Sequence, residues 1–219
     1  MSITKAFLPN HQDIVVYQDD EMFCINTDTT VLGEFLNIYR NDTVLDMGTN
    51  NGALLLYASL FNPKKLIGLE INSKALELAK KNLEENHITN YQLINDNIVT
   101  YKGEEVDVII CNPPYFKTPK DELCENEYKA LAKHEGELTL ELLIASIRRN
   151  LKNYGTLYFL FLTSRLQEVV DEMKKNKLRI KEMKFVYDVN KELSNVVLIK
   201  AVKGGNYGMK VSKPIIITR

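Results

Sequence analysis

The sequence predicts an α/β fold with a mainly parallel, seven-stranded sheet, helices on both of its faces and an antiparallel edge near its C-terminal end. Short apolar runs alternate with helical patterns along most of the 219 residues, which is typical of parallel strands joined by crossover helices. The run 106–111 is apolar almost throughout, as expected of a strand that is covered on both faces. The runs 184–189 and 196–202 lack a helix between them, so we expect them to pair as antiparallel strands.

Residues 1–40 predict an extension that precedes the main fold. Apolar runs at 14–17 and 22–25 flank a polar turn, which indicates a strand pair. A helix with apolar residues at three- and four-residue steps follows this pair. We expect a single domain over residues 1–219, with the hairpin and this helix as its N-terminal extension.

Helices and strands then alternate along the chain. The first helix is expected to run from a cap at Thr27 or Asp28 to about Tyr39, and later helices are expected to begin at caps formed by Ser73 and Ser164. The strands expected in the sheet are 43–47, 65–71, 91–95, 106–111, 155–162, 184–189 and 196–202, followed by a short strand at 214–218.

The composition is that of an ordinary globular protein, with 45% hydrophobic and 26% charged residues. No apolar run approaches the roughly 20 residues that span a bilayer, and the first residues lack the charged and apolar regions of a signal peptide. We therefore expect a cytoplasmic protein without membrane contact. The cysteines and histidines lack the spacing of a metal site, so no metal is expected, and a monomer is assumed.

Charge is distributed unevenly along the chain. Residues 133–219 hold 17 lysines and arginines against 9 aspartates and glutamates, whereas residues 1–132 hold 11 against 20. Such asymmetry indicates a face for an anionic polymer. An ordinary solvated surface explains it equally well, since the lysine-rich run 174–177 also fits an exposed helix end.

Polar residues follow several of the predicted strands at their carboxyl ends. These are the glycine-containing segment 46–52, Glu70, the pair 96–97 and Asn112. Ligands of an open parallel sheet bind outside these strand ends. A glycine loop followed by an acid could hold a dinucleotide, because the carboxylate accepts both ribose hydroxyls, but the loop lacks the pattern GxGxxG.

The segment Asn112-Pro113-Pro114-Tyr115-Phe116 directly follows the strand expected at 106–111 and combines an amide, two prolines and two aromatic residues. Prolines cannot donate ladder hydrogen bonds, so the strand must end here. The side-chain carbonyl of Asn112 and the backbone carbonyl of Pro113 could accept both hydrogens of an exocyclic amine and direct its lone pair, while the two prolines restrict the backbone. Tyr115 offers a face for stacking a base, and Phe116 an apolar wall.

The pattern D-x-G-x-N-x-G, then Glu, Asp and NPPYF, resembles the class I S-adenosylmethionine-dependent methyltransferases that act on exocyclic amines, which have a Rossmann-like fold. The resemblance implies S-adenosylmethionine as the cofactor. Most members carry glycine where this chain has Asn50, and we expect the loop geometry to be preserved because asparagine tolerates a left-handed backbone. The cofactor-binding residues implied are Asp46, Gly48, Thr49, Asn50, Gly52, Glu70, Ile71, Asp96, Asn97 and Asn112.

The resemblance also implies roles for these residues. Gly48 and Gly52 would let the backbone approach the methionine part of the cofactor. Asp46 would orient the loop or reach the amino group. Glu70 would hold the ribose, Ile71 would pack on adenine, and Asp96 would accept a hydrogen bond from the adenine amino group.

A closer resemblance, over nearly the whole chain, is to the bacterial family that methylates adenine N6 beside the anticodon of valine tRNA. It implies a tRNA partner, methylation of adenine 37 with the base flipped into the site, and RNA contacts by the basic C-terminal half and by residues 117–136. Asn112, Pro113, Pro114 and Tyr115 would be catalytic; Tyr115, Phe116 and His134 would bind the substrate. His134 would organise the acceptor pocket or serve only as a local hydrogen-bond partner. The supporting features are Thr27-Asp28 with Val31-Leu32, the segment 112–116, Lys133-His134-Glu135, and Lys203-Gly204-Gly205 with Pro214.

The NPPY motif by itself leaves other acceptors open. Proteins that carry it methylate adenine N6, cytosine N4, guanine N2 or protein glutamine N5. An rRNA guanine-N2 or a protein glutamine-N5 methyltransferase is therefore a second enzyme hypothesis. A protein that binds RNA on this scaffold without transferring a methyl group is a third.

Overall fold

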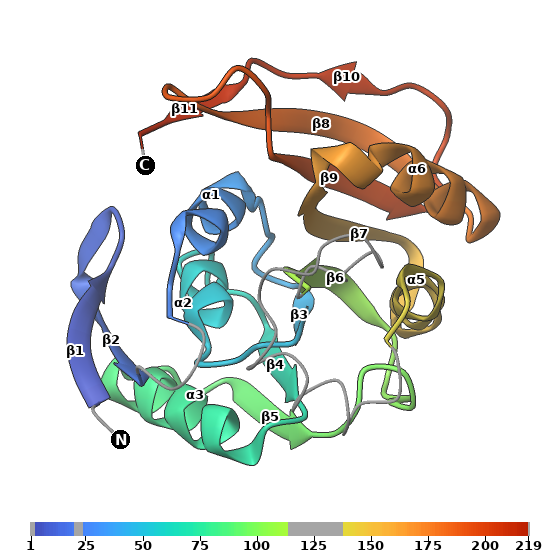
Figure 1. Ribbon diagram of the computed structural model, residues 1–219. Coiled ribbons are helices and arrows are strands. Elements are labelled where there is room, and N and C mark those ends of the chain that lie inside the picture. Colours follow the sequence, from blue (N-terminus) through green and yellow to red (C-terminus); the bar gives the residue numbers. More distant parts are fainter. Residues whose placement is uncertain (1–2, 20–23, 114–137, 219) are drawn as a thin grey trace.

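The computed structural model describes residues 3–19, 24–113 and 138–218. Within these residues a nine-stranded sheet forms the centre of the molecule, in the order β10-β8-β9-β7-β6-β3-β4-β5, with β11 also paired with β8 (Figure 1). The strands are β3 (Thr43–Met47), β4 (Lys65–Glu70), β5 (Tyr91–Asn95), β6 (Val106–Cys111), β7 (Leu151–Leu162), β8 (Leu178–Asp188), β9 (Val196–Lys203), β10 (Lys210–Val211) and β11 (Ile215–Ile217).

Strands β3 to β7 run parallel to their neighbours, whereas β9 is antiparallel to both β7 and β8. This confirms the predicted parallel sheet with an antiparallel C-terminal edge. Strands β7 and β8 begin earlier than predicted, and the short strands β10 and β11 extend the edge by pairing with β8 in parallel.

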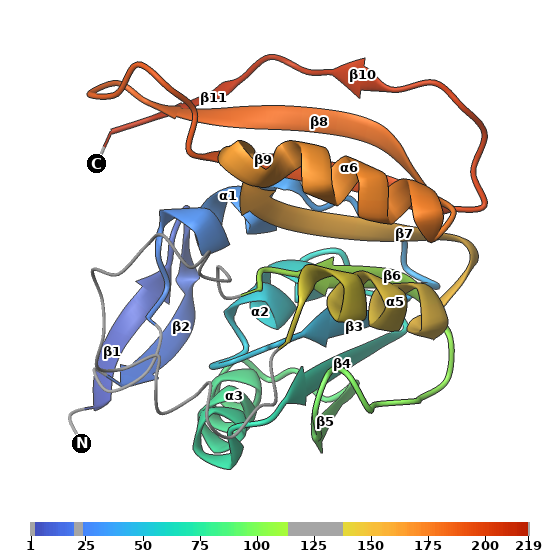
Figure 2. The same ribbon diagram turned by 45° about the vertical axis from the view of Figure 1, so that its right-hand side comes forward.

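Helices cover both faces of the sheet. One face carries α1 (Thr27–Phe35), α2 (Ala53–Ser59) and α3 (Ser73–Glu85); the other carries α5 (Leu140–Asn150) and α6 (Leu166–Lys175), the latter preceded by a 3-10 turn, η1 (Thr163–Arg165). Figure 2 shows α5 and α6 on the same side of the sheet. Alternate side chains of β6 enter the two cores, Val108 and Ile110 on one side and Ile109 and Cys111 on the other. Burial on both sides explains why this strand is apolar apart from Asp107.

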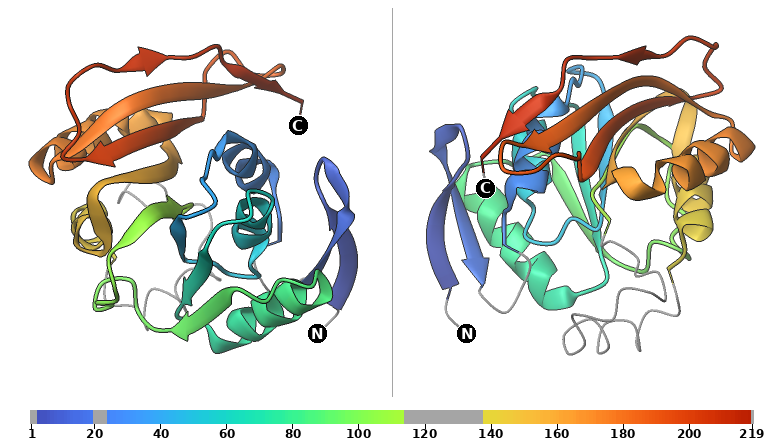
Figure 3. Two further views of the ribbon diagram at one scale, coloured as in Figure 1. Left: turned by 180° about the vertical axis from the view of Figure 1, so that it is seen from behind. Right: turned by 45° about the horizontal axis from the view of Figure 1, so that its top comes forward.

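The N-terminal hairpin differs from the prediction. Strands β1 (Ile3–Leu8) and β2 (His11–Asp19) form a separate two-stranded sheet that lies beside α3 (Figure 3). The predicted pairing of 14–17 with 22–25 is wrong, because 14–17 belongs to β2 and pairs with β1; residues 20–23 lie outside the described part of the chain. The turn that decides this is Pro9-Asn10, in which Asn10 has a positive φ of 65°, a conformation that asparagine tolerates in tight turns.

Asparagines begin two of the helices in place of the predicted caps. The Asn26 side chain accepts a hydrogen bond from the Thr29 N–H, and that of Asn72 accepts from the Lys74 and Ala75 N–H groups. Helix α6 starts after η1 and has no side-chain cap. The predicted caps were Thr27 or Asp28, Ser73 and Ser164.

Two further properties hold for the residues that the structure describes. No helix among them is long and apolar enough to cross a membrane. No group of three or more His, Cys, Asp or Glu side chains among them could hold a metal ion.

Candidate functional site

The polar ends of four neighbouring parallel strands meet at one edge of the sheet. Met47 at the end of β3 lies opposite Leu69 of β4 on one side and Cys111 of β6 on the other. Glu70 and Asn112, which follow those two residues, therefore start from the same level on either side of β3. The chain order also reverses here, because β4 and β5 lie to one side of β3, and β6 and β7 to the other. Open parallel sheets bind their ligands at such a point.

The loop after β3 is built from left-handed backbone conformations. Gly48 has φ +82°, Asn50 has φ +49° and Gly52 has φ +80°. Asn50 thus adopts the conformation that the sequence predicted for it. The N–H groups of Gly48 and Thr49 both donate to the carbonyl of Leu69, at 2.9 and 3.0 Å, which holds the loop against the end of β4.

Gly48 and Gly52 differ in the surroundings that an added side chain would meet. Among the described residues, a Cβ added at Gly48 would come within 4 Å only of Ile98 Cδ1, at 3.8 Å, so no described side chain crowds this glycine. A Cβ added at Gly52 would lie 3.2 Å from Ala79 Cβ, so Gly52 allows the start of α2 to pack on α3. Only Gly48 has the surroundings expected of a backbone that a ligand approaches.

Asp46 is the penultimate residue of β3, and its carboxyl group is fully buried. Its Oδ2 accepts a hydrogen bond of 2.7 Å from Thr49 Oγ1, whereas Oδ1 has no partner within the described segments. Burial raises the pKa of Asp46 to about 7; the Thr49 bond acts in the opposite direction, and the nearby charge of Glu70 adds to the rise. Because this pKa lies near neutral pH, a substantial fraction of Asp46 is protonated there. A nearby cation would favour the ionised form.

Asn51 contributes a second buried polar atom to the same loop. Its Oδ1 accepts from the Ala53 N–H at 3.3 Å, and its Nδ2 has no partner among the residues described. The loop therefore combines an unused acceptor on Asp46 with an unused donor on Asn51. A ligand that carries both an ammonium and a carboxylate group, as an amino acid does, has the complementary set.

Glu70 connects the loop to the start of α3. Its Oε2 accepts from the Asn50 N–H and its Oε1 from the Asn72 N–H, both at 2.9 Å. Each carboxylate oxygen has a second lone pair, so acceptor capacity remains for ribose hydroxyls. Asn95 Nδ2 donates to the carbonyls of Glu70 and Ile71, at 2.9 and 2.8 Å, and Ile71 exposes 37% of its surface beside the acid. The sequence prediction did not include Asn95.

Asp96 and Asn97 shape the turn after β5. Asp96 Oδ1 accepts from the Asn97 N–H at 2.7 Å and from Thr100 Oγ1 at 3.3 Å, while Asn97 Oδ1 accepts from the Val99 N–H at 2.8 Å. These are the bonds of turn-forming residues. Asp96 is exposed, and its Oδ2 makes no hydrogen bond in the described part of the chain, so one oxygen is available to a ligand.

Helix α5 anchors the same turn through residues that the sequence prediction missed. Ser146 Oγ donates to the carbonyl of Ile98 at 2.5 Å, and Arg149 Nη2 donates to the carbonyls of Val99 and Tyr101, both at 2.9 Å. In the sequence, this contact is indicated by Ser146, a small polar residue on the apolar face of the helix. These bonds fix the position of Ile98, the side chain that faces Gly48.

Gly68 in β4 is a further residue that the sequence prediction missed. A Cβ at this position would lie 2.7 Å from Leu93 Cδ2, 2.9 Å from Thr49 Cγ2 and 3.0 Å from Leu55 Cδ1. Glycine here lets the loop after β3 lie directly on β4. The signal was a glycine inside an apolar strand, which marks a close approach of another segment.

Asn112 and Pro113 directly follow β6, half-buried and buried respectively. They are thus next to the loop that follows β3, since β3 and β6 are paired neighbours. The other residues predicted to take part in catalysis or substrate binding lie outside the described segments: Pro114, Tyr115, Phe116 and His134.

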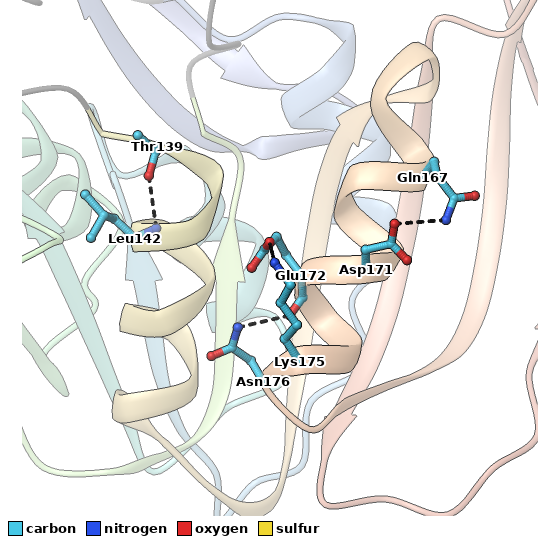
Figure 4. Close-up of polar contacts among 7 residues, drawn as sticks. All are labelled: Thr139, Leu142, Gln167, Asp171, Glu172, Lys175 and Asn176. Atoms are coloured by element: carbon cyan, nitrogen blue, oxygen red, sulfur yellow. Dashed lines mark hydrogen bonds and ion pairs between the residues drawn. The ribbon is translucent and has the colours of Figure 1, made fainter.

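An open groove of about 860 Å³ lies elsewhere, between α5 and α6 (Figure 4). Some of its polar side chains are bonded to nearby residues: Asp171 accepts from Gln167 Nε2 at 3.1 Å, and Glu172 accepts from Lys175 Nζ at 2.5 Å. None of the predicted site residues that the structure describes lines this groove. The described residues of the predicted site lie at the strand ends and not in this groove.

Comparisons with known proteins bear on the family of this chain. A family model described as a methyltransferase domain matches residues 38–197. The tRNA1(Val) (adenine(37)-N6)-methyltransferase of Vibrio campbellii is 30% identical over 176 residues, which cover 75% of this chain and 72% of that protein. The protein of the same name from Bacteroides thetaiotaomicron is 28% identical over 149 residues, covering 66% of this chain and 62% of its own length.

The chain spans about 60% of the length of several of these curated relatives. Among solved structures, M. jannaschii TYW2 in complex with AdoMet superposes with a TM-score of 0.65 at 14% identity, covering 92% of this chain and 85% of that one. This likeness concerns the fold.

Proposed function

We propose that this chain, which belongs to the methyltransferase domain family and uses S-adenosylmethionine, methylates the N6 amine of an adenine in tRNA. The acceptor we propose is adenine 37, beside the anticodon of valine tRNA. The observation that carries the proposal is the similarity to curated relatives named for this reaction, together with Asn112 and Pro113 at the end of β6.

The residues at the strand ends fit S-adenosylmethionine. Asp46 and Asn51 would serve its ammonium and carboxylate groups, because they supply the buried acceptor and donor that lack partners in the described chain. Glu70 would accept from the ribose hydroxyls, and Ile71 would pack against adenine. Gly48 leaves room for the ligand beside the loop. When bound, the cofactor supplies an electrophilic methyl group carried on a sulfonium.

Asn112 and Pro113 would orient the amine that receives the methyl group. The lone pair of an aromatic amine is delocalised into its ring, so the amine is a weak nucleophile. Two carbonyl oxygens that accept both of its hydrogens favour a pyramidal nitrogen and direct the lone pair towards the methyl group. The rigid proline backbone keeps this alignment, which matters in a reaction that depends mainly on positioning.

The acceptor base would be flipped out of its stack to reach this site. Tyr115 would stack on the extruded base, which contributes roughly 1–3 kcal/mol against the cost of unstacking, and Phe116 would add an apolar wall. His134 would help to organise the acceptor pocket. Replacing Tyr115 by alanine should therefore raise the KM for the acceptor and leave cofactor affinity unchanged.

Methyl transfer to defined acceptors tests the proposal. Bulk tRNA, rRNA and protein from a strain that lacks this protein are each incubated with the purified protein and tritiated methyl donor, and the labelled nucleoside or amino acid is identified and mapped. Label in N6-methyladenosine at position 37 of valine tRNA is expected. Label in N2-methylguanosine of rRNA or in protein glutamine would contradict the acceptor assignment. A protein that binds the cofactor but labels no RNA or protein would contradict the enzymatic assignment.

A further inference from the structure

Two asparagines of α3 hold the edge of the N-terminal hairpin. Asn86 Oδ1 accepts from the Val15 N–H at 2.9 Å, and Asn86 Nδ2 donates to the Val15 carbonyl at 2.7 Å. Asn82 binds Tyr17 in the same way, with bonds of 2.7 Å from the N–H and 3.0 Å to the carbonyl. Each amide thus replaces one missing partner of the β ladder.

The geometry of helices and strands explains why this arrangement works. Residues four apart on a helix are separated by about 6 Å along its axis. Residues two apart on a strand are separated by about 6.6 Å and present their backbone groups to the same edge. One turn of α3 therefore matches two residues of β2, and the asparagine pair closes an edge that would otherwise expose unpaired backbone groups.

Asn82 makes one contact that Asn86 does not make. Its Nδ2 also donates to the carbonyl of Asn51, at 2.8 Å, in the loop between β3 and α2. Asn86 Nδ2 instead donates to the carbonyl of Asn82, within α3 itself. Asn82 is fully buried, and Ala79, one turn before it, packs on Gly52 of the same loop.

Asn82 therefore uses three hydrogen bonds to join the hairpin, α3 and the loop that carries Asn51. A buried carbonyl left without a hydrogen-bond partner costs about 1–3 kcal/mol. The loop is therefore most stable in the position in which the Asn82 amide can donate to the Asn51 carbonyl. The sequence holds a signal for this role, because Asn82 is a polar residue on the apolar face formed by Leu78, Ala79 and Leu83.

We propose that Asn82 is a positioning residue of the cofactor site, which holds the loop 48–52 through Asn51 and couples cofactor binding to docking of the N-terminal hairpin. Such coupling is reciprocal: cofactor that stabilises the loop also stabilises the docked hairpin, by the same factor. The proposal rests on the assignment of the loop to S-adenosylmethionine and is independent of which base or protein accepts the methyl group.

A matched pair of variants tests the first half of the proposal. Asn82→Ala and Asn86→Ala each remove two hydrogen bonds to the backbone of β2. Only Asn82→Ala also removes the hydrogen bond to the Asn51 carbonyl. The hairpin keeps a separate anchor in both variants, the bond of 3.0 Å from Tyr57 Oη to the Pro9 carbonyl. S-adenosylmethionine affinity is measured by calorimetry, without any acceptor, at a temperature well below both unfolding midpoints.

We expect the Kd for S-adenosylmethionine to rise about tenfold or more in Asn82→Ala and to stay within about twofold in Asn86→Ala, with similar losses of thermal stability in both. An unchanged Kd in Asn82→Ala, or equal rises in the two variants, would overturn the positioning role. If tRNA methylation proves absent while this difference in affinity is found, the proposed acceptor fails and the positioning role stands.

Hydrogen exchange of the wild-type protein tests the coupling and needs no variant, so it also decides the matter if Asn82→Ala does not fold. Saturating S-adenosylmethionine should slow exchange at the Val15 and Tyr17 amides several-fold more than at the Ser212 amide. The Ser212 amide is bonded to the Met183 carbonyl at the far edge of the sheet and reports general stabilisation. Equal slowing at all three amides, or no slowing in the hairpin, would overturn the coupling.

Discussion

Asp46 illustrates how one buried residue links the fold to the site. Its carboxyl group is fully buried, and only one of its oxygens finds a partner, Thr49, within the described residues. Burial is the main reason why the pKa of Asp46 rises to about 7. The fold therefore retains an acid whose ionised form it does not stabilise by itself, as is common at functional sites.

This pKa predicts how stability depends on pH. The folded protein keeps the Asp46 proton up to about pH 7, whereas the unfolded chain loses it near the usual value of 3.8. The contribution of this pKa shift to the free energy of unfolding is fully present below about pH 4 and is lost as the pH rises through 7. The resulting decrease in the free energy of unfolding is on the order of 4 kcal/mol. In urea unfolding, Asp46→Asn should lose less stability than wild type between pH 4 and 7. If the free energy of unfolding depended on pH in the same way in both proteins, that result would contradict the raised pKa of Asp46.

Gly48 allows a prediction that separates ligand binding from backbone strain. Alanine at φ +82° costs about 1–2 kcal/mol of folding stability, and its methyl group would project into the space that we assign to the cofactor. Gly204 also has a positive φ, +69°, and a Cβ added there would meet no described atom within 4 Å, but Gly204 lies after β9 and away from the loop in sequence. We expect Gly48→Ala and Gly204→Ala to lose similar stability, and calorimetry to find weakened S-adenosylmethionine binding in Gly48→Ala alone.

Asn112 should matter for the transfer step and little for cofactor binding. Asn112→Ala removes one of the two acceptors that we propose for the amine, so kcat should fall by about a hundredfold or more, while the Kd for S-adenosylmethionine stays near normal. Single-turnover methyl transfer and calorimetry measure the two quantities separately. A variant with undiminished turnover would remove Asn112 from the catalytic assignment.

At the scale of secondary-structure elements, the loop after β3 depends on the strand beneath it. A Cβ at Gly68 would lie 2.9 Å from the Thr49 side chain, whose hydroxyl group is bonded to Asp46. Gly68→Ala should thus displace the loop, lower the free energy of unfolding by about 1–3 kcal/mol and weaken cofactor binding.

Gly205→Ala is a suitable control for this prediction. The three described atoms nearest to a Cβ at Gly205 all belong to Val202, at 3.2 Å and more, and Gly205 lies far along the chain from the loop. Denaturant unfolding and calorimetry on both variants should find the loss of cofactor affinity in Gly68→Ala only. Unchanged cofactor affinity in Gly68→Ala would mean that β4 does not position the loop.

Element boundaries show where prediction from local patterns succeeds. Strands β3, β4, β5 and β6 begin and end within a residue of their predicted bounds, because apolar runs and flanking polar residues define them locally. The hairpin was mispaired, because the run 14–17 is compatible with a partner on either side. The Pro9-Asn10 turn and the asparagines of α3 select the earlier one.

At the scale of the whole molecule, the uneven charge predicts how tRNA binding responds to salt. Residues 133–219 carry the excess of lysine and arginine, and several of these side chains lack an ion pair in the described chain. If they contact phosphates, tRNA affinity should fall by about tenfold or more between 50 and 200 mM salt. Filter binding measures this, with S-adenosylmethionine affinity over the same range as the control. If tRNA affinity did not change with salt, the lysines and arginines of residues 133–219 would be excluded as a phosphate-binding surface.

The sequence by itself determined the fold class, the strand ends and the chemical types gathered at them, because periodicity, turn residues and motifs are local properties of the chain. Tertiary structure alone decided which groups meet. It placed Asn82 between the hairpin and the Asn51 carbonyl, aimed Ser146 and Arg149 at the turn after β5, and made Gly48 open and Gly52 packed. These contacts join segments that are distant in sequence, and their partners are mostly backbone carbonyls, which every residue carries. A polar residue on an apolar helix face, such as Asn82 or Ser146, indicates that such a contact exists, but no residue pattern could have identified its partner.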